Sequence, residues 1–340
     1  MATLKPLSEK NLAKQYAAAG IDEIQKDFLH KFFTACANLY GVLEIRDIWQ
    51  IYKELAAHND LPKLLRKDFI VFSGITMRET QPYSVFEIDD IYCDEPRSDL
   101  SRTLVKKSLV GKGQGKFWDV YRLTESQADK PFFVTDNLLS FAEERENAEA
   151  IALKTFLDNL IVAKREYTTN WGKHIHCEHF GQKLKDFCYY DSFEKMEIEN
   201  LSKVDKNGNN KNAAKLEALL KELDIPASVK IFNQIKWRTN IGHIPPADFI
   251  KYLLDDLEIL GVALSEEELH ELLNMLNNYN NNTHLLCNRG WKPVDLAHSM
   301  TSNGPLSINF GPGMQKTFAN GDLDQNELIQ KLTTMGIKVL

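Results

Sequence analysis

Imidazole and thiol side chains gather in one short stretch of the sequence. His174, His176, Cys177 and His179 lie within six residues of one another. Imidazole nitrogens and thiolate sulfurs are good zinc ligands, and a cysteine with a neighbouring histidine base is the basis of thiol catalysis. On a helix, His176 and His179 share a face and His174 points elsewhere. Two interpretations follow: a metal-dependent or thiol enzyme that uses His176, Cys177 and His179, and a polar helix face.

A second candidate for chemistry is a basic and aromatic segment, residues 97–122. Between Arg97 and Lys116 it has six bases and one acid, Asp99. Basic side chains interleaved with aromatic rings can hold single-stranded nucleic acid by phosphate contact and base stacking. The competing interpretation is a solvated loop followed by a core strand. The candidate binding residues in this segment are Arg102, Lys106, Lys107, Lys112, Lys116, Trp118, Tyr121 and Arg122.

The most distinctive stretch is an Asn-rich segment, residues 277–293, which we call the Asn-rich knot. Asparagine tolerates the left-handed conformation, so Asn280–Asn282 can end the helix that starts at the Ser265–Glu268 capping box. Pro293 then has the position of a first helical residue. The knot can hold two helices in register, or it can form a recognition surface. The candidate binding residues for that surface are Asn281, Asn282, Thr283, Arg289 and Trp291.

This knot resembles a stretch found in a group of uncharacterised bacterial proteins. The shared pattern is Asn-Asn-x-Thr, an apolar or aromatic pair, Asn-x-Gly, an aromatic residue or histidine, a Thr-Pro pair and a leucine. The positions that carry it here are Asn281, Asn282, Thr283, Leu285, Asn288, Gly290, Trp291, Pro293 and Leu296. Lys292 departs from the threonine of the pattern. Some proteins of that group have a cysteine-rich zinc tail of the SEC-C type, but no cysteine or histidine follows His298 here, so no zinc tail is implied.

The sequence patterns predict that the elements that position these residues are mainly α-helical, with a small β component. Residues 27–93 have the order of a winged helix, three helices and then a β-hairpin within 83–92. This region has ten acidic and seven basic residues. Binding of duplex DNA requires neutralisation of phosphates, so we expect a protein-contact or scaffold role for it instead.

Further along, the pattern predicts a strand over 131–134 and an Asp136-capped helical region up to about residue 161. Residues 202–212 are polar, lack apolar periodicity and are the expected linker. The predicted organisation is a winged-helix-like module at 1–95, a basic-aromatic segment and helical middle region at 96–201, the linker, and a helical C-terminal domain at 213–340 that contains the knot.

Composition limits the functional classes. A net charge of −7 gives no global attraction to nucleic acid or to an anionic membrane. An odd number of cysteines and the lack of a long apolar run predict a cytoplasmic protein without a membrane span. No complete catalytic signature is present. The sequence therefore favours a non-enzymatic binding or regulatory protein that acts through protein–protein contacts, without a cofactor; nucleic-acid binding and a zinc or thiol enzyme are the alternatives.

Overall fold

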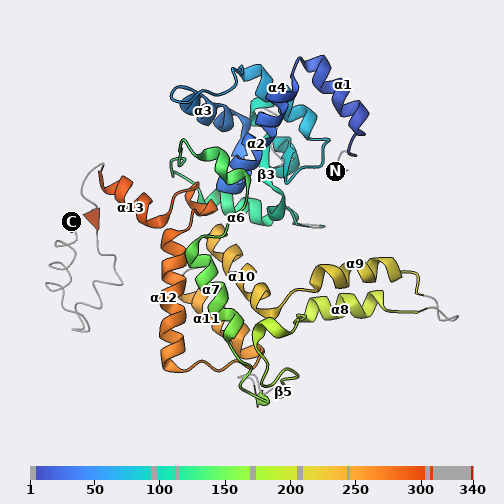
Figure 1. The fold of residues 1–340 in the computed structure, drawn as a ribbon, viewed down its shortest axis with the longest axis vertical. Helices are drawn as coiled ribbons and strands as arrows, with labels where there is room; N and C mark the ends of the chain where they lie inside the picture. The colour runs from blue at the N-terminus through green and yellow to red at the C-terminus, as the bar shows by residue number, and fades with distance from the viewer. Residues whose placement is uncertain are drawn as a thin grey trace.

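The computed structural model describes residues 5–92, 98–111, 113, 115–168, 174–204, 210–242, 246–302, 307–308 and 338–339. These residues form thirteen α-helices and a few short strands, which confirms a mainly helical fold with a small β component. The helices build an upper and a lower half, and a pair of helices projects from the lower half as an arm (Figure 1). No helix among the described residues combines the length and the apolar character that crossing a bilayer requires.

The upper half is an N-terminal module built around one long helix, α2. Asp22 and Gln25 form a capping box at the start of α2, and Gly41 ends it with a φ of 77°. Aromatic side chains from α2, α4 and β2, among them Phe33, Phe72 and Tyr83, pack into one core. The elements of the module are α1 (Glu9–Ala19), α2 (Glu23–Tyr40), β1 (Val42–Glu44), α3 (Ile45–Ala56), α4 (Arg66–Thr76), β2 (Tyr83–Phe86), α5 (Ile88–Tyr92) and β3 (Thr103–Lys106).

The sheet of the module differs from the β-hairpin that the sequence predicted. Three antiparallel strands lie in the order β1–β3–β2, and Leu104 of the central strand is opposite Leu43 on one side and Val85 on the other. The hairpin expected within 83–92 is wrong, because β2 ends at Phe86 and the chain turns into α5. Asp89 and Asp90 lie in the first turn of α5, where acidic side chains are favourable. The winged-helix interpretation of the module stays a prediction.

Outside β3, the described chain between residues 98 and 147 is mostly irregular. It contains the 3₁₀ turns η1 (Asp99–Ser101), η2 (Lys107–Leu109) and η3 (Leu138–Ala142) and the helix α6 (Trp118–Ser126). The strand expected over 131–134 does not form, since the only described backbone bond there is Phe133 N–H to Arg289 O. Asp136 caps no helix; its carboxylate accepts a hydrogen bond from Asn59. The cap is instead Asn147, at the start of α7 (Ala148–Asn159).

The lower half is a helical layer in which α7 packs against α10 and α12. Leu153, Ile235 and Leu276 meet in its core. The remaining elements of the chain are β4 (Glu166–Thr168), β5 (His174–His176), η4 (Leu184–Asp186), α8 (Ser192–Leu201), α9 (Ala213–Leu223), α10 (Ala227–Ile241), α11 (Pro246–Ile259), α12 (Glu266–Asn282), η5 (Leu286–Asn288), α13 (Pro293–Ser302), β6 (Ser307–Ile308) and β7 (Lys338–Val339).

Residues 202–212, the expected linker, connect α8 and α9, which pack against each other as the arm. Residues 205–209 lie outside the described part of the chain.

The two halves share a third core at their junction. Val105 of β3, Leu123 of α6 and Ile241 of α10 pack there with Leu285, Leu286 and Cys287 of the Asn-rich knot. The knot therefore lies between the halves. As expected, α12 ends at its asparagine run, since its last residue is Asn282, although no asparagine of the described run takes the left-handed conformation. The left-handed residues are Arg289, with a φ of 48°, and Gly290, with a φ of 81°.

Candidate functional site

The histidine–cysteine cluster lies on a β-hairpin and not on the helix that the spacing suggested. His174 and His176 are in β5, which pairs with β4 so that Thr168 faces His174 and Glu166 faces His176. The ring of His174 contacts Glu166 at 3.1 Å and is exposed. His176 and His179 therefore do not share a helix face. The helix expectation is wrong because pairing with 166–168 supplies the backbone hydrogen bonds.

His176 is exposed, whereas His179 and Cys177 pack against other side chains and the backbone. The ring of His179 stacks on Phe187 with centroids 3.9 Å apart. Cys177 is buried against Gly261, and burial raises the pKa of its thiol, which disfavours the reactive thiolate. Within the described residues, no three His, Cys, Asp or Glu side chains converge as a metal site would require.

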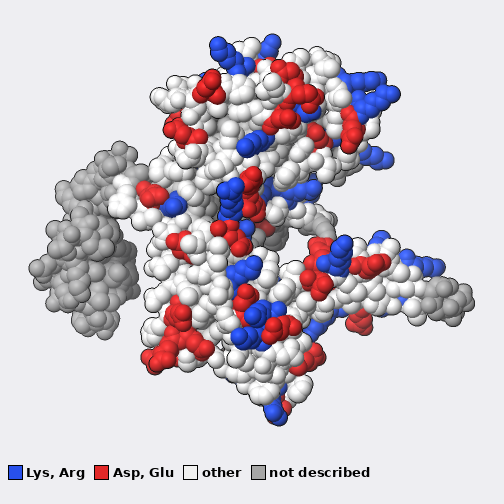
Figure 2. All heavy atoms as spheres, viewed as in Figure 1, with Lys and Arg blue, Asp and Glu red and all other residues white. Residues whose placement is uncertain are grey.

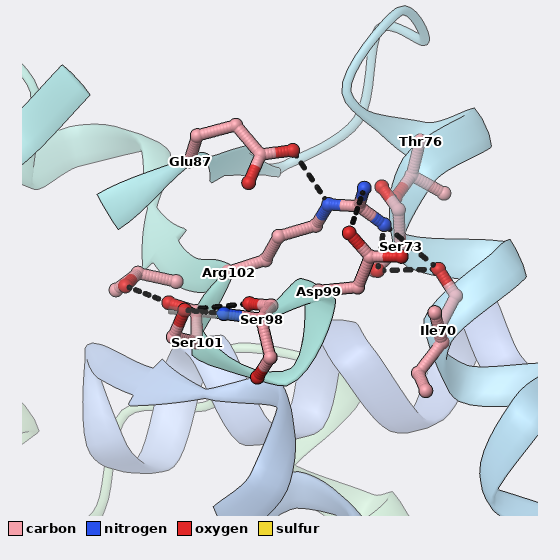
Figure 3. A network of polar contacts seen from close by, with 9 residues as sticks. Ile70, Ser73, Thr76, Glu87, Ser98, Asp99, Ser101 and Arg102 are labelled. Carbon is pink, nitrogen blue, oxygen red and sulfur yellow. Dashed lines mark hydrogen bonds and ion pairs between the residues drawn. The ribbon is translucent and has the colours of Figure 1, made fainter. Parts of the chain in front are cut away.

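The basic-aromatic segment does not form one surface. Arg102 turns inward beneath α4, where its guanidinium contacts Glu87 at 2.7 Å, Asp99 at 2.9 Å and the carbonyl oxygen of Ile70 at 3.2 Å (Figure 3). Lys106 pairs with Glu144 in the space between the halves. These two bases are therefore already neutralised by carboxylates.

The other candidate bases of the segment face different neighbours. Lys107 is exposed, and Lys116 lies 4.6 Å from the ring centre of Phe117. Arg122 lies over the exposed Trp118 at 5.6 Å and 3.9 Å from Asp119. The hydroxyl of Tyr121 donates to the carbonyl oxygen of Ile91. Lys112 lies outside the described residues.

The Asn-rich knot fastens the lower half to the segment that follows α6. The side-chain amide of Gln127 donates to the carbonyl oxygens of Tyr40, at 2.6 Å, and Leu286, at 2.7 Å. Arg289 donates to the carbonyl oxygen of Lys130 at 2.8 Å, and the indole N–H of Trp291 donates to that of Pro131 at 3.1 Å. Arg289 and Trp291 thus have a structural part in the junction.

The three polar residues at the end of α12 have other partners. Asn281 and Asn282 bond to Asn277 and Asn278, one turn earlier on the same helix. Thr283 accepts a hydrogen bond from Asn147 at 2.9 Å. The five knot residues expected to form one recognition surface are therefore divided among three sets of partners.

A cleft opens where the two halves meet. Its main part has a volume of about 450 Å³, and an adjoining part of about 170 Å³ shares Lys106, Glu144 and Lys236 with it. Side chains of both charges gather at this level of the surface (Figure 2). Lys106 comes from the basic-aromatic segment, and Thr283 of the knot lines the adjoining part. One member of each surface expected from the sequence therefore lines this cleft.

Two lysines from different halves converge on one carboxylate in the cleft. Lys106 of β3 contacts one oxygen of Glu144, and Nζ of Lys236 of α10 lies 3.5 Å from the other. Burial alone would raise the pKa of Glu144, but the hydrogen bond and charge of Lys106, with the charge of Lys236, hold it below its ordinary value. The carboxylate is therefore ionised at neutral pH, and the three side chains carry a net charge of about +1.

Amides and apolar groups complete the cleft walls. Asn38 donates through its amide nitrogen to the carbonyl oxygen of Phe141 at 2.9 Å, which leaves its amide oxygen as an acceptor. Asn240 is held by the carbonyl oxygen of Lys236 and the N–H of Leu286. The apolar part consists of Leu109, Ile241, Leu286 and the indole of Trp237.

The indole N–H of Trp237 donates to Asp119 at 2.9 Å, which fixes the ring at the edge of the cleft. Sequence reasoning missed this site, although Asn233, Lys236, Trp237 and Asn240 fall at helical spacing on one face of α10. A polar stripe with a tryptophan was the one local signal. Glu144 gave none, because it lies in a charged run between two helical turns.

The chain matches no protein-family model, no curated protein and no solved structure.

Proposed function

We propose that the protein is a non-enzymatic binding protein that holds a small amphipathic organic anion in the cleft between its two halves. The observation that carries this proposal is the convergence of Lys106 and Lys236, from different halves, on one side of a 450 Å³ cleft. Cavities of this volume are typical of small-molecule sites, and a few converging polar groups orient the ligand in them.

The anionic group of the ligand would take the position that the Glu144 carboxylate holds. That carboxylate already satisfies both lysines at once, so the spacing of the two ammonium groups suits a carboxylate or a phosphate. Glu144 is half exposed and follows a 3₁₀ turn, so it can turn to solvent when a ligand replaces it. Glu144 thus competes with the ligand for the ammonium groups of Lys106 and Lys236.

The apolar part of the ligand would lie against Leu109, Ile241 and Leu286. Trp237 gives a planar surface at the same wall, where an aromatic ring can stack. Asn38 and Asn233 can orient polar substituents through their amides. Such a mixed lining favours an aromatic or branched acid over a simple inorganic ion.

Thr34 and His284, which line the cleft, already have hydrogen-bond partners. The hydroxyl of Thr34 donates to the carbonyl oxygen of His30 at 2.7 Å, and Nδ1 of His284 lies 2.6 Å from the carbonyl oxygen of Gly290. Neither is paired with the other as a nucleophile and base would be. This arrangement supports binding without catalysis.

The proposal can be tested with benzoate and phenyl phosphate as probes and benzyl alcohol as a neutral probe of the same ring. Binding is followed through the indole N–H signal of Trp237, assigned with Trp237→Phe. We expect saturable shifts with one or both anions and none with the alcohol. The preferred anion tells whether the natural ligand is a carboxylate or a phosphate.

Lys236→Gln is expected to weaken anion binding at least several-fold, because it removes one of two ammonium groups. Lys107→Gln is the matched control, since this lysine is exposed and lines no part of the cleft. No shift with either anion in the wild-type protein, or equal loss in both variants, would refute the proposal.

Nucleic-acid binding by residues 97–122 and a zinc or thiol site at 174–179 are weaker proposals. Three bases of the first, Arg102, Lys106 and Arg122, pair with carboxylates, and His174 and His179 of the second contact separate neighbours. We retain the cytoplasm as the proposed location, from the odd number of cysteines in the sequence.

A further inference from the structure

One edge of the sheet in the N-terminal module is open. The described strands have the order β1–β3–β2, so β2 lies at the edge of the sheet. The backbone N–H of Lys107 donates to the carbonyl oxygen of Pro82 at 3.2 Å, and the residue pairs of an antiparallel ladder alternate between bonded and non-bonded. Tyr83 and Val85 therefore direct their backbone N–H and carbonyl groups away from β3. None of these groups has a hydrogen-bond partner among the described residues.

A pocket of about 340 Å³ lies against this edge. All residues of β2 line it, together with two chain segments, residues 5–6 and 76–81. The N–H of Leu7 donates to the carbonyl oxygen of Arg78 at 2.9 Å, which ties the first segment to the second. An unpaired strand edge is a template for another strand. The pocket therefore offers room beside backbone groups that can still form hydrogen bonds.

The charged side chains of this pocket are mostly basic. Lys5, Arg78 and Lys107 line it, and the one acidic residue of the described lining is Glu79. None of the basic side chains pairs with a carboxylate in the described part of the chain, and the buried Nε of Arg78 has no hydrogen-bond partner there. The carboxylate of Glu79 accepts a hydrogen bond from the hydroxyl of Tyr16 at 2.7 Å. The pocket therefore carries an excess of positive charge.

This combination of groups suits an extended acidic peptide better than a small anion. A small anion would contact the basic side chains but leave the backbone groups of Tyr83 and Val85 unpaired. A peptide strand added to β2 would bond to these groups, because strand addition works through main-chain hydrogen bonds. Every second side chain of a strand points the same way, so carboxylates at alternate positions can reach the bases of the pocket.

We propose that the outer edge of β2 binds an acidic, extended segment of a partner protein as a further strand of the sheet. The backbone of that segment pairs with Tyr83 and Val85, and its carboxylates contact Lys5, Arg78 and Lys107. The protein-contact role expected from the sequence thus acquires a definite place and a partner of definite charge. The site is independent of the cleft ligand, because the pocket and the cleft share no lining residue.

Fluorescence anisotropy of the full chain with a labelled octapeptide tests this proposal. In the probe, glutamate alternates with valine, a residue that favours strands. We expect saturable binding of this acidic peptide and no binding when lysine replaces glutamate. The acidic peptide methylated at every backbone nitrogen keeps its charge but has no N–H to donate, so we expect it to bind at least about tenfold more weakly.

A double substitution tests the basic side chains. Lys5→Gln/Lys107→Gln is expected to weaken binding of the acidic peptide by roughly five- to tenfold, because it removes two cations of the pocket. Lys63→Gln/Lys67→Gln is the matched control, since both lysines belong to the same module and line neither the pocket nor the cleft. All these lysines are exposed, so circular dichroism should show both variants folded. The control is expected to bind the peptide as the wild type does.

The place of binding is read from the backbone amide NMR signals of Tyr83 and Val85, which we expect to shift as the acidic peptide is added. A wild-type protein that does not bind the acidic peptide would overturn the proposal. Equal affinity for the methylated peptide would overturn it too, because strand pairing would then have no part in binding. Equal weakening in the two double variants, or tighter binding of single-stranded oligothymidylate than of the peptide, would likewise count against an acidic peptide as the partner.

Discussion

A methyl group on Gly290 of the Asn-rich knot would lie 2.7 Å from Cγ of Leu39 in α2. The knot thus comes so close to the central helix of the N-terminal module that no side chain fits between them. Gly290 also has a φ of 81°, which other residues adopt at a cost of roughly 1–2 kcal/mol. Steric fit and backbone conformation both require glycine here.

Gly290→Ala is therefore expected to lower the free energy of unfolding by about 2–4 kcal/mol. Gly20→Ala is the control, since Gly20 has a similar φ of 70° but open space around it, and we expect a loss of about 1 kcal/mol. Urea unfolding followed by circular dichroism measures both. Equal losses in the two variants would mean that the contact with Leu39 has no effect on stability.

Arg102→Met is expected to destabilise the N-terminal module by about 2 kcal/mol, because it leaves Glu87 and the carbonyl oxygen of Ile70 without their donor. Arg122→Met is the control, because its contact with Asp119 is long, at 3.9 Å, and its side chain is more exposed than that of Arg102; we expect a loss below about 0.5 kcal/mol. Thermal unfolding compares them. If Arg102→Met left the melting temperature unchanged, the contacts of Arg102 with Glu87, Asp99 and Ile70 would not contribute to stability.

Two half-buried histidines make stability depend on pH. Burial lowers the pKa of His30, partly offset by Glu79, and lowers the pKa of His284, partly offset by the carbonyl oxygen of Gly290. The unfolded chain therefore binds these protons more readily than the folded one. Stability is full above the ordinary histidine value near 6.5 and is lost as the pH falls below it.

We expect a melting temperature lower by a few degrees at pH 5.5 than at pH 7.5. His284→Gln should make this dependence shallower, whereas His58→Gln, at an exposed position, should not change it. Differential scanning calorimetry at the two values provides the measurement. A melting temperature that rises toward pH 5.5 would contradict the assignment.

Local signals in the sequence predicted the helices well. Gly41 ends α2, the Ser265–Glu268 capping box starts α12 and Pro293 starts α13, as the residues indicated. Each of these boundaries depends on hydrogen bonds within a few residues. The same reasoning was wrong at 174–176 and at 83–92, because the strands there, β5 and β2, are stabilised by pairing with other segments, β4 and β3.

The cleft was beyond such reasoning for the same physical reason. Lys106 and Lys236 lie 38 and 92 positions from Glu144, and only the packing of the two halves brings the three together. The asparagine run did mark the end of α12 at Asn282, but the left-handed turn expected there lies at Arg289 and Gly290. Distant pairs of this kind have no pattern in a single sequence.

The most direct test of the binding proposal compares Glu144→Gln with its neighbour Glu143→Gln. Glu143 pairs with Arg145 and contacts neither lysine in the described structure, so it controls for the loss of one negative charge in the same loop. Isothermal titration with benzoate and phenyl phosphate gives the affinities. We expect Glu144→Gln to bind the preferred anion about tenfold more tightly than the wild type, and Glu143→Gln to differ little from it. An affinity that falls in Glu144→Gln, or rises equally in both variants, would contradict the account.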